Sequence, residues 1–177
     1  MQKLILTEEE QMVRESAADF LSQKAGPDAL RKIRDTANPQ GFSSEVWLEM
    51  AELGWPSILI QEAQGGLGFS HVAMGQIMEL CGSTLACSPL FSTAVVGASV
   101  LSLGGDRLAL LPKVAAGSLT LALAIDEAPR HNPQGIATRA VRRGDGYTLN
   151  GEKTLVVDGN VAEYLIVSVR ADEDPND

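Results

Sequence analysis

The 177-residue sequence predicts an α+β protein, with an all-α N-terminal domain followed by an incomplete antiparallel β domain. Up to residue 117, apolar residues recur at the three- and four-residue spacing of amphipathic helices. From residue 118 onward, short apolar runs alternate with turn residues, as strands do. Because the strands follow the helices in a block instead of alternating with them, the order favours α+β. We therefore expect two domains, over residues 1–117 and 118–177.

The first helix is predicted over residues 7–23, because Thr7 and Glu10 have the spacing of a capping box. Its core-facing residues would be Val13, Ala17, Phe20 and Leu21. A Gly-Pro pair ends this helix, and residues 28–34 could form a short second one.

Two further helices begin at serine caps. One starts after Ser43 or Ser44 and ends at Gly54, and the other starts at Ser70. Between them, residues 55–68 are expected to form a loop with a short extended run. The predicted inner faces are Val46, Trp47, Met50 and Ala51 in one helix, and Ala73, Ile77, Leu80 and Cys81 in the other.

Residues 89–103 are apolar nearly all round, which predicts a buried helix ended by two glycines. A last helix is expected over residues 106–116, shortened by Pro112, with Leu108, Leu111 and Val114 facing inward.

In the β region, Asn150-Gly151 separates two short strand-like runs, residues 147–149 and 153–157. Asn-Gly is the strongest short signal for a two-residue hairpin turn. Residues 119–125 and 164–169 also read as strands, and a polar tail follows. If a cofactor binds, we expect it where this sheet meets the preceding helices.

Composition narrows the class of protein. The net charge of −9 argues against a surface that binds nucleic acid. The arginines near residue 142 are interpreted as the solvent-exposed end of a strand. Two cysteines without a CxxC pair indicate a reducing compartment and no common zinc motif. Neither a signal peptide nor an uninterrupted membrane-length apolar run is present, so we expect a soluble cytoplasmic protein without membrane insertion.

Residue chemistry alone identifies no catalytic residue and no metal site. The glycine-rich loop at residues 65–68 matches neither the dinucleotide nor the Walker pattern, so a purely geometric role is favoured. The two histidines, His71 and His131, are too few for a metal site. A Cys81–His dyad has no support beyond the presence of both residue types in the chain. The adjacent carboxyls of Asp126 and Glu127 could act as acid and base, although a hydrogen-bonded turn is the favoured reading.

Several segments nevertheless resemble the acyl-CoA dehydrogenases. Residues 144–153, GDGYTLNGEK, are close to the family pattern G-D-x-Y-x-L-N-G-x-K, the most specific match. Residues 62–70 are similar to P-E-x-x-G-G-x-G-x-S, residues 51–55 to the family's "aelGw" helix end, and residues 111–117 to its "LPklasG" segment. The resemblance covers the whole chain but only about the first half of a family member, whose C-terminal helical domain has no counterpart here.

The resemblance implies FAD-dependent α,β-desaturation of an acyl-CoA, in fatty acid or steroid degradation. A glutamate base removes the α-proton while a hydride leaves the β-carbon for the flavin. That glutamate lies in the family's C-terminal domain, so neither Asp126 nor Glu127 is the base.

The family's flavin segments align with residues 125–132 and 155–157. The first family pattern, T-E-P-G-A-G-S-D, begins in this sequence with Ile125 in place of threonine. The second pattern, W-I-T, is replaced by Leu-Val-Val. Two hydroxyls and the aromatic wall of the family's flavin site are therefore missing. The implied cofactor positions are Ala124, Ile125, Asp126, Leu155, Val156 and Val157, and His131 takes a substrate-binding position.

Three functional hypotheses stay open. The chain could be part of an active dehydrogenase in a homo- or hetero-oligomer. It could instead be a non-catalytic partner subunit, with a degenerate flavin site, of a heteromeric dehydrogenase acting on bulky or steroid side-chain acyl-CoAs. The third hypothesis is a structural or CoA-binding module without redox chemistry.

Overall fold

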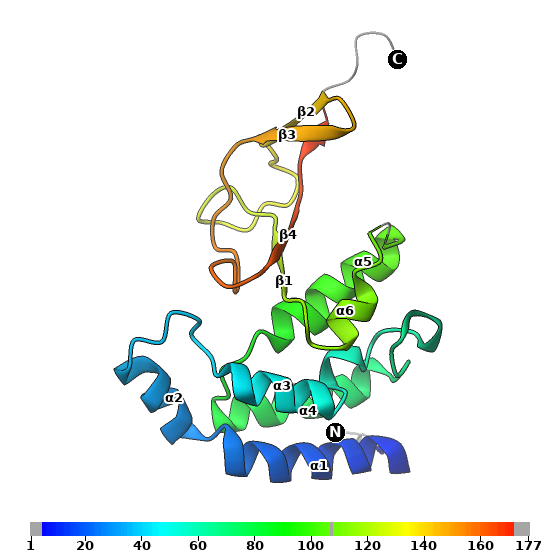
Figure 1. Cartoon of the computed structure of the whole chain (residues 1–177), viewed down its shortest axis with the longest axis vertical. Helices are drawn as coiled ribbons and strands as arrows, with labels where there is room; N and C mark the ends of the chain where they lie inside the picture. Colours follow the sequence, from blue (N-terminus) through cyan, green and yellow to red (C-terminus); the bar gives the residue numbers. More distant parts are fainter. Residues whose placement is uncertain (1–4, 107, 172–177) are drawn as a thin grey trace.

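The computed structural model describes residues 5–106 and 108–171, and the predictions for the first four residues and the polar tail after residue 171 lie outside these ranges. The α+β class is confirmed, with helices in one part of the molecule and strands in the other (Figure 1). The helical elements are α1 (Glu8–Lys24), α2 (Pro27–Asp35), α3 (Ser44–Glu52), the 3₁₀ turns η1 (Trp55–Ser57) and η2 (Glu62–Gln64), α4 (His71–Thr84), the π-helix η3 (Phe91–Gly97), α5 (Ala98–Gly104) and α6 (Leu111–Ala115). The strands are β1 (Leu121–Ala124), β2 (Arg139–Arg143), β3 (Gly146–Asn150), β4 (Tyr164–Val167) and β5 (Arg170–Ala171).

The predicted helix caps are confirmed. At α1, the Thr7 hydroxyl accepts from the Glu10 amide at 3.2 Å, and the Thr7 amide donates to the Glu10 carboxylate at 3.0 Å. Ser43 and Ser70 cap α3 and α4. Gly54 follows α3 with a φ of 78°, a left-handed conformation that glycine adopts without strain.

Two apolar clusters hold the helices together. The larger is formed by α1, α3, η1, α4 and the start of the η3 segment, and includes Leu21, Met50 and Ile77, which are fully buried. The smaller joins α5 and α6 to β1 through Leu111, Val114 and Leu121. Since β1 shares this second cluster, the first strand is packed as part of the helical region, and the domain boundary after residue 117 stays a prediction.

Three local predictions in the helical region are wrong. The expected extended run after η1 is a series of tight turns, since the amides there bond to carbonyls three residues back. The last helix begins only at Leu111, because the Asp106 carboxylate accepts from the amides of Leu110 and Leu111 and Leu108 is 72% exposed. The apolar segment after Pro89 is not buried all round, because Leu103 is 90% exposed.

The hairpin also differs from the prediction. β3 pairs antiparallel with β2, and the turn is Gly144-Asp145 instead of Asn150-Gly151. Residues 152–154 form no strand; the Thr154 amide bonds to the carbonyl of Asp126, far back in the chain. The other two pairs, β1–β4 and β2–β5, are parallel, so the described β region mixes both orientations instead of being wholly antiparallel.

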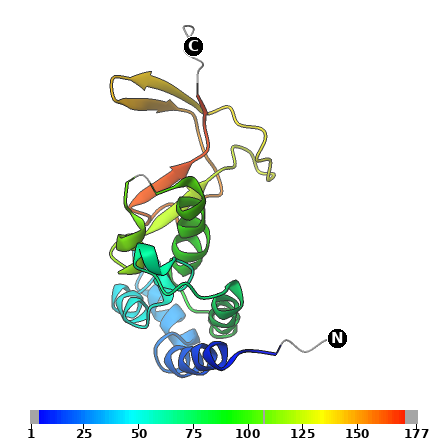
Figure 2. The ribbon, with the colours of Figure 1, turned by 90° about the vertical axis from the view of Figure 1, so that its right-hand side faces the viewer.

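The β region extends away from the helices. In both views β1 and β4 lie beside the helices, and the β2–β3 hairpin is at the far end (Figures 1 and 2). Among the residues that the structure describes, no helix is long and apolar enough to cross a membrane.

Candidate functional site

A cavity of about 290 Å³ opens where the strands meet the helices, at the junction where a cofactor was expected. It lies between η3, the end of β1 and the loop after Lys153. Its lining consists of Phe91, Ser92, Val96, Leu123, Ile125, Asp126, His131, Thr154, Leu155 and Val157. We call it the junction pocket. Five of the seven predicted binding residues thus come together in one place.

Two predicted residues are not in this lining. Ala124 is 1% exposed and buried within β1. The Val156 side chain lies against the backbone turn at Gly159, where an added Cβ would come within 2.8 Å of it. These two residues shape the strand and the turn behind the pocket.

One polar pair lies in the lining. Nδ1 of His131 is 3.0 and 3.1 Å from the two carboxylate oxygens of Asp126, and the Asn132 amide donates to the same carboxylate at 3.1 Å. The hydrogen bond from His131, followed by that from Asn132, lowers the pKa of Asp126 below its ordinary value. The carboxylate therefore anchors the imidazole at the pocket opening, where the His131 side chain is 69% exposed.

The next residue, Glu127, holds the loop from behind. Lys153 Nζ donates to Glu127 Oε1 at 2.7 Å, to the Ile125 carbonyl at 3.0 Å and to Ser168 Oγ at 3.0 Å. The two side chains are only 9% and 12% exposed. We call this pair the Glu127–Lys153 clip, and it fixes one pocket wall against the other.

Glu127 is fully engaged by its partners. Besides Lys153, it accepts from the amides of Ala137 and Thr138 at 2.6 and 3.0 Å and from the Thr138 hydroxyl at 2.6 Å. The hydrogen bond from Lys153 and then those from Thr138 and Ala137 lower the pKa of Glu127 to about 2. Both carboxylates are thus hydrogen-bonded within the strand region, which favours a structural role for Asp126 and Glu127.

Sequence reasoning missed the helical wall of the pocket. Phe91, Ser92 and Val96 come from η3, whose π-helical winding is often found at functional sites. The Ser92 hydroxyl donates to the Asp158 carboxylate at 2.6 Å, which ties η3 to the loop carrying Val157. The only sequence signal was a serine and a threonine inside an otherwise apolar run.

The glycine-rich loop has the predicted geometric role. Its amides donate to carbonyls of the same loop; Gly68, for instance, bonds to Ile60 at 2.8 Å and Leu67 to Ser57 at 3.0 Å. A Cβ on Gly66 would lie 2.0 Å from the Ile60 carbonyl oxygen. The loop amides are therefore used internally instead of cradling a phosphate.

Two sites that the sequence disfavours, a Cys81–His dyad and a metal site, gain no support from the structure. Burial raises the pKa of the Cys81 thiol to about 11, so it is protonated at neutral pH and a poor nucleophile. Within residues 5–106 and 108–171, no group of three or more His, Cys, Asp or Glu side chains could hold a metal ion.

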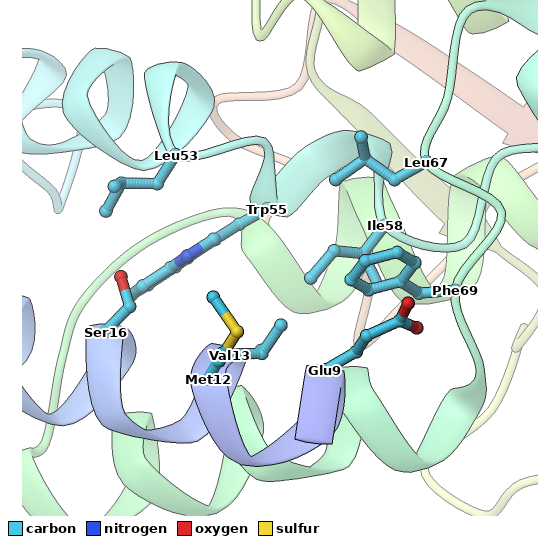
Figure 3. Close-up of a pocket in the computed structure, with 9 residues that line it drawn as sticks. All are labelled: Glu9, Met12, Val13, Ser16, Leu53, Trp55, Ile58, Leu67 and Phe69. Carbon is cyan, nitrogen blue, oxygen red and sulfur yellow. The ribbon is translucent and has the colours of Figure 1, made fainter. Parts of the chain in front are cut away.

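A second cavity, of about 270 Å³, lies between α1 and the η1 loop (Figure 3). Met12, Trp55 and Phe69 are among its mostly apolar lining, and Glu9 and Ser16 are its polar members. It contains none of the predicted site residues and no cluster of reactive groups, so it is not the candidate site.

Comparison with known proteins decides the family. The family model described as acyl-CoA dehydrogenase, N-terminal domain, matches residues 7–118. The chain belongs to the acyl-CoA dehydrogenase family. This confirms the resemblance drawn from the motifs.

The relatives are longer than this chain. It is 30% identical over 175 residues to acyl-CoA dehydrogenase FadE12 of Mycobacterium tuberculosis, covering 96% of this chain and 44% of that protein. Among solved structures, a Tcur3481-Tcur3483 steroid ACAD variant has a TM-score of 0.81 at 28% identity, covering 93% of this chain and 45% of that one. The ChsE4-ChsE5 complex from Mycobacterium tuberculosis has a TM-score of 0.82 at 24% identity, covering 97% and 46%, and shows the shared fold. The chain thus spans less than half the length of these relatives.

The junction pocket fits a flavin ring poorly. Ile125, Leu155 and Val157 have no hydrogen-bonding side-chain group, whereas the ring edge of a flavin carries several donors and acceptors. The Asp126 carboxylate is already engaged by His131 and Asn132. The side chains of the pocket therefore provide apolar contacts for such a ring but few hydrogen bonds.

Proposed function

We propose that the chain is one part of a FAD-dependent acyl-CoA dehydrogenase, desaturating an acyl-CoA thioester in the cytoplasm as part of a larger protein or complex. The observation that carries this proposal is the match of residues 7–118 to the N-terminal domain of the family. Two flavin segments, aligned by family resemblance, converge on one cavity where the strands meet the helices.

In this proposal the chain's residues shape the site and perform no chemical step. Phe91, Val96 and Leu123 form an apolar side of the pocket, and the Glu127–Lys153 clip holds the other side in place. When bound, FAD supplies the oxidation. The proton-abstracting base would come from a segment outside this chain's own 177 residues or from another subunit.

A specific observation favours a second candidate, a non-catalytic partner subunit with a degenerate flavin site. The apolar side chains of Ile125, Leu155 and Val157 stand where the family has hydroxyls and an aromatic ring. The likeness to a steroid acyl-CoA dehydrogenase and to a two-component complex supports a heteromer that acts on bulky or steroid side-chain acyl-CoAs.

The visible absorption spectrum of the purified chain distinguishes the candidates, measured alone and after co-expression with a neighbouring dehydrogenase subunit. Flavin bands in the chain alone would support the first proposal and a competent flavin site. Flavin bands only in the complex would support the partner subunit. If flavin and dehydrogenase activity are missing from both, the redox proposal fails and a structural or CoA-binding module is left.

A double substitution tests the placement of the flavin segment. Leu155→Trp with Val157→Thr restores the aromatic and hydroxyl groups of the family pattern, so bound flavin per chain should increase. Leu149→Trp, on the exposed hairpin away from the pocket, is the matched control and should change nothing. An unchanged flavin content in a folded double variant would contradict the placement of these residues against the ring.

A further inference from the structure

The loop that carries Leu155 and Val157 into the junction pocket has a strained backbone. Leu155 has a φ of 54° and Asp158 a φ of 56°, in the left-handed region that residues other than glycine seldom adopt. Leu155 is 68% exposed, so burial of its side chain does not fix this conformation. Strained residues persist where the surrounding structure holds them, and they are concentrated at functional sites. Contacts at the two ends of the loop must therefore hold its shape.

One such contact lies at each end. Before Leu155, the Thr154 amide donates to the Asp126 carbonyl at 2.8 Å, which joins the loop to the other flavin segment. After Val157, the Asp158 carboxylate accepts a hydrogen bond from the Ser92 hydroxyl at 2.6 Å, which joins the loop to η3. We call the second one the Ser92–Asp158 contact.

Ser92 belongs to a wall that is itself fixed to the rest of the fold. Its hydroxyl is also 3.1 Å from the Pro89 carbonyl, but it has a single proton, and the closer carboxylate oxygen is the stronger acceptor. The next residue, Thr93, is fully buried, and its hydroxyl bonds to the amide of Leu121 at 3.0 Å and to the carbonyl at 3.3 Å. The two adjacent hydroxyls of η3 thus anchor it to β1 and attach the loop to it.

We propose that Ser92 and Asp158 are positioning residues, which set where the wall formed by Leu155 and Val157 stands in the junction pocket. Neither makes or breaks a bond. The inference rests on the proposed function only for the identity of the flavin as the group that this wall meets. It gives a role to the buried serine in an otherwise apolar run of the sequence.

Two substitutions at Asp158 separate the hydrogen bond from the backbone conformation. Glycine and asparagine both adopt the left-handed region, but only asparagine keeps an oxygen acceptor for Ser92. The readout is hydrogen exchange of the Val161 and Ala162 amides, which donate to the Asp158 carbonyl at 3.1 and 3.0 Å. We expect Asp158→Gly to accelerate this exchange about tenfold or more, the effect of losing a hydrogen bond to a charged group, and Asp158→Asn to stay within about threefold of wild type.

Ser92→Ala removes the same contact from the other side and leaves the loop sequence unchanged. It should accelerate the exchange of the two loop amides as Asp158→Gly does. Ser99→Ala in α5 is the matched control, because its hydroxyl donates to the Val95 carbonyl in the same helical stretch. Unchanged exchange in Ser92→Ala, or equally fast exchange in Asp158→Asn and Asp158→Gly, would overturn the proposal.

Bound flavin distinguishes positioning from a merely structural role. In the preparation that holds flavin, the chain alone or the co-expressed complex, Asp158→Gly should lose flavin and Asp158→Asn should retain it. Full flavin content in Asp158→Gly despite fast loop exchange would overturn the positioning role. Missing flavin in every wild-type preparation would instead remove the redox proposal, and the exchange rates would still decide whether the Ser92–Asp158 contact holds the wall.

Discussion

The helical region and the strand region are stabilised in different ways. From α1 to β1, two clusters of buried apolar side chains hold the elements together. Beyond Ala124, the only buried residues among those described are Thr138 and Ala140. The strand region is held instead by polar contacts, above all by the Glu127–Lys153 clip. Apolar burial therefore builds the scaffold, and directional hydrogen bonds set the geometry of the site attached to it.

Exposed apolar side chains occur in both regions, since Leu103 is 90% and Met12 69% exposed in the helical one. Tyr147 is 63% exposed, Leu155 68% and Val157 57%. Leu155 and Val157 lie together in the lining of the junction pocket, and contiguous exposed apolar residues commonly mark surfaces that other protein segments or ligands cover. The pattern supports the proposal that this region works inside a larger protein or complex.

The largest expected effect comes from the helical core. Ile77→Ala empties a fully buried position in α4 and should lower the free energy of unfolding by about 2–5 kcal/mol. Leu149→Ala in β3 removes a side chain that is 49% exposed and should cost about 0.5 kcal/mol or less. Urea unfolding followed by circular dichroism measures both. Equal losses of unfolding free energy in the two variants would contradict the difference in apolar burial between the two regions.

A smaller effect is expected where the helical region meets the first strand. Trp47 Nε1 donates to the Gly117 carbonyl at 2.9 Å in a buried contact. Trp47→Phe leaves that carbonyl without its donor, so the unfolding free energy should fall by about 1–3 kcal/mol. The exposed Leu48→Phe is the neighbouring control. No change in Trp47→Phe would show that water replaces the indole donor.

The sequence predicts the helices better than the site, and the reason is physical. Helix caps such as Thr7 with Glu10 depend on residues three apart, so a local pattern reveals them. The hairpin was misplaced because Lys153 and Thr154 bond to Ile125 and Asp126, which no local rule can anticipate. Family resemblance pointed to Ile125, Leu155 and Val157, which line the junction pocket, but the η3 wall depends on tertiary packing alone.

The smallest effect on global stability should come from Lys153→Met, although its local effect is large. The partners of Lys153 all lie in the strand region, at Ile125, Glu127 and Ser168. The urea midpoint of the helical region should therefore stay unchanged, while hydrogen exchange at the Ala137 and Thr138 amides accelerates. Lys113→Met, in the last turn of α6, is the matched control. A lowered global midpoint would show that the clip also supports the helices.

The pH dependence of the clip follows from the Glu127 carboxyl, whose pKa in the folded chain is about 2. In an unfolded chain a glutamate has a pKa of about 4.3, so folding favours the ionised form. The stabilisation is complete above about pH 4.3 and is lost as the pH falls toward the folded value. Because Lys153 is the largest cause of the lowered pKa, Lys153→Met should move the Glu127 carboxyl titration, followed by ¹³C NMR, upward toward the ordinary value. A titration that does not move would assign the low pKa to the Thr138 and Ala137 donors instead, and the clip would then be a consequence of the loop conformation and not its cause.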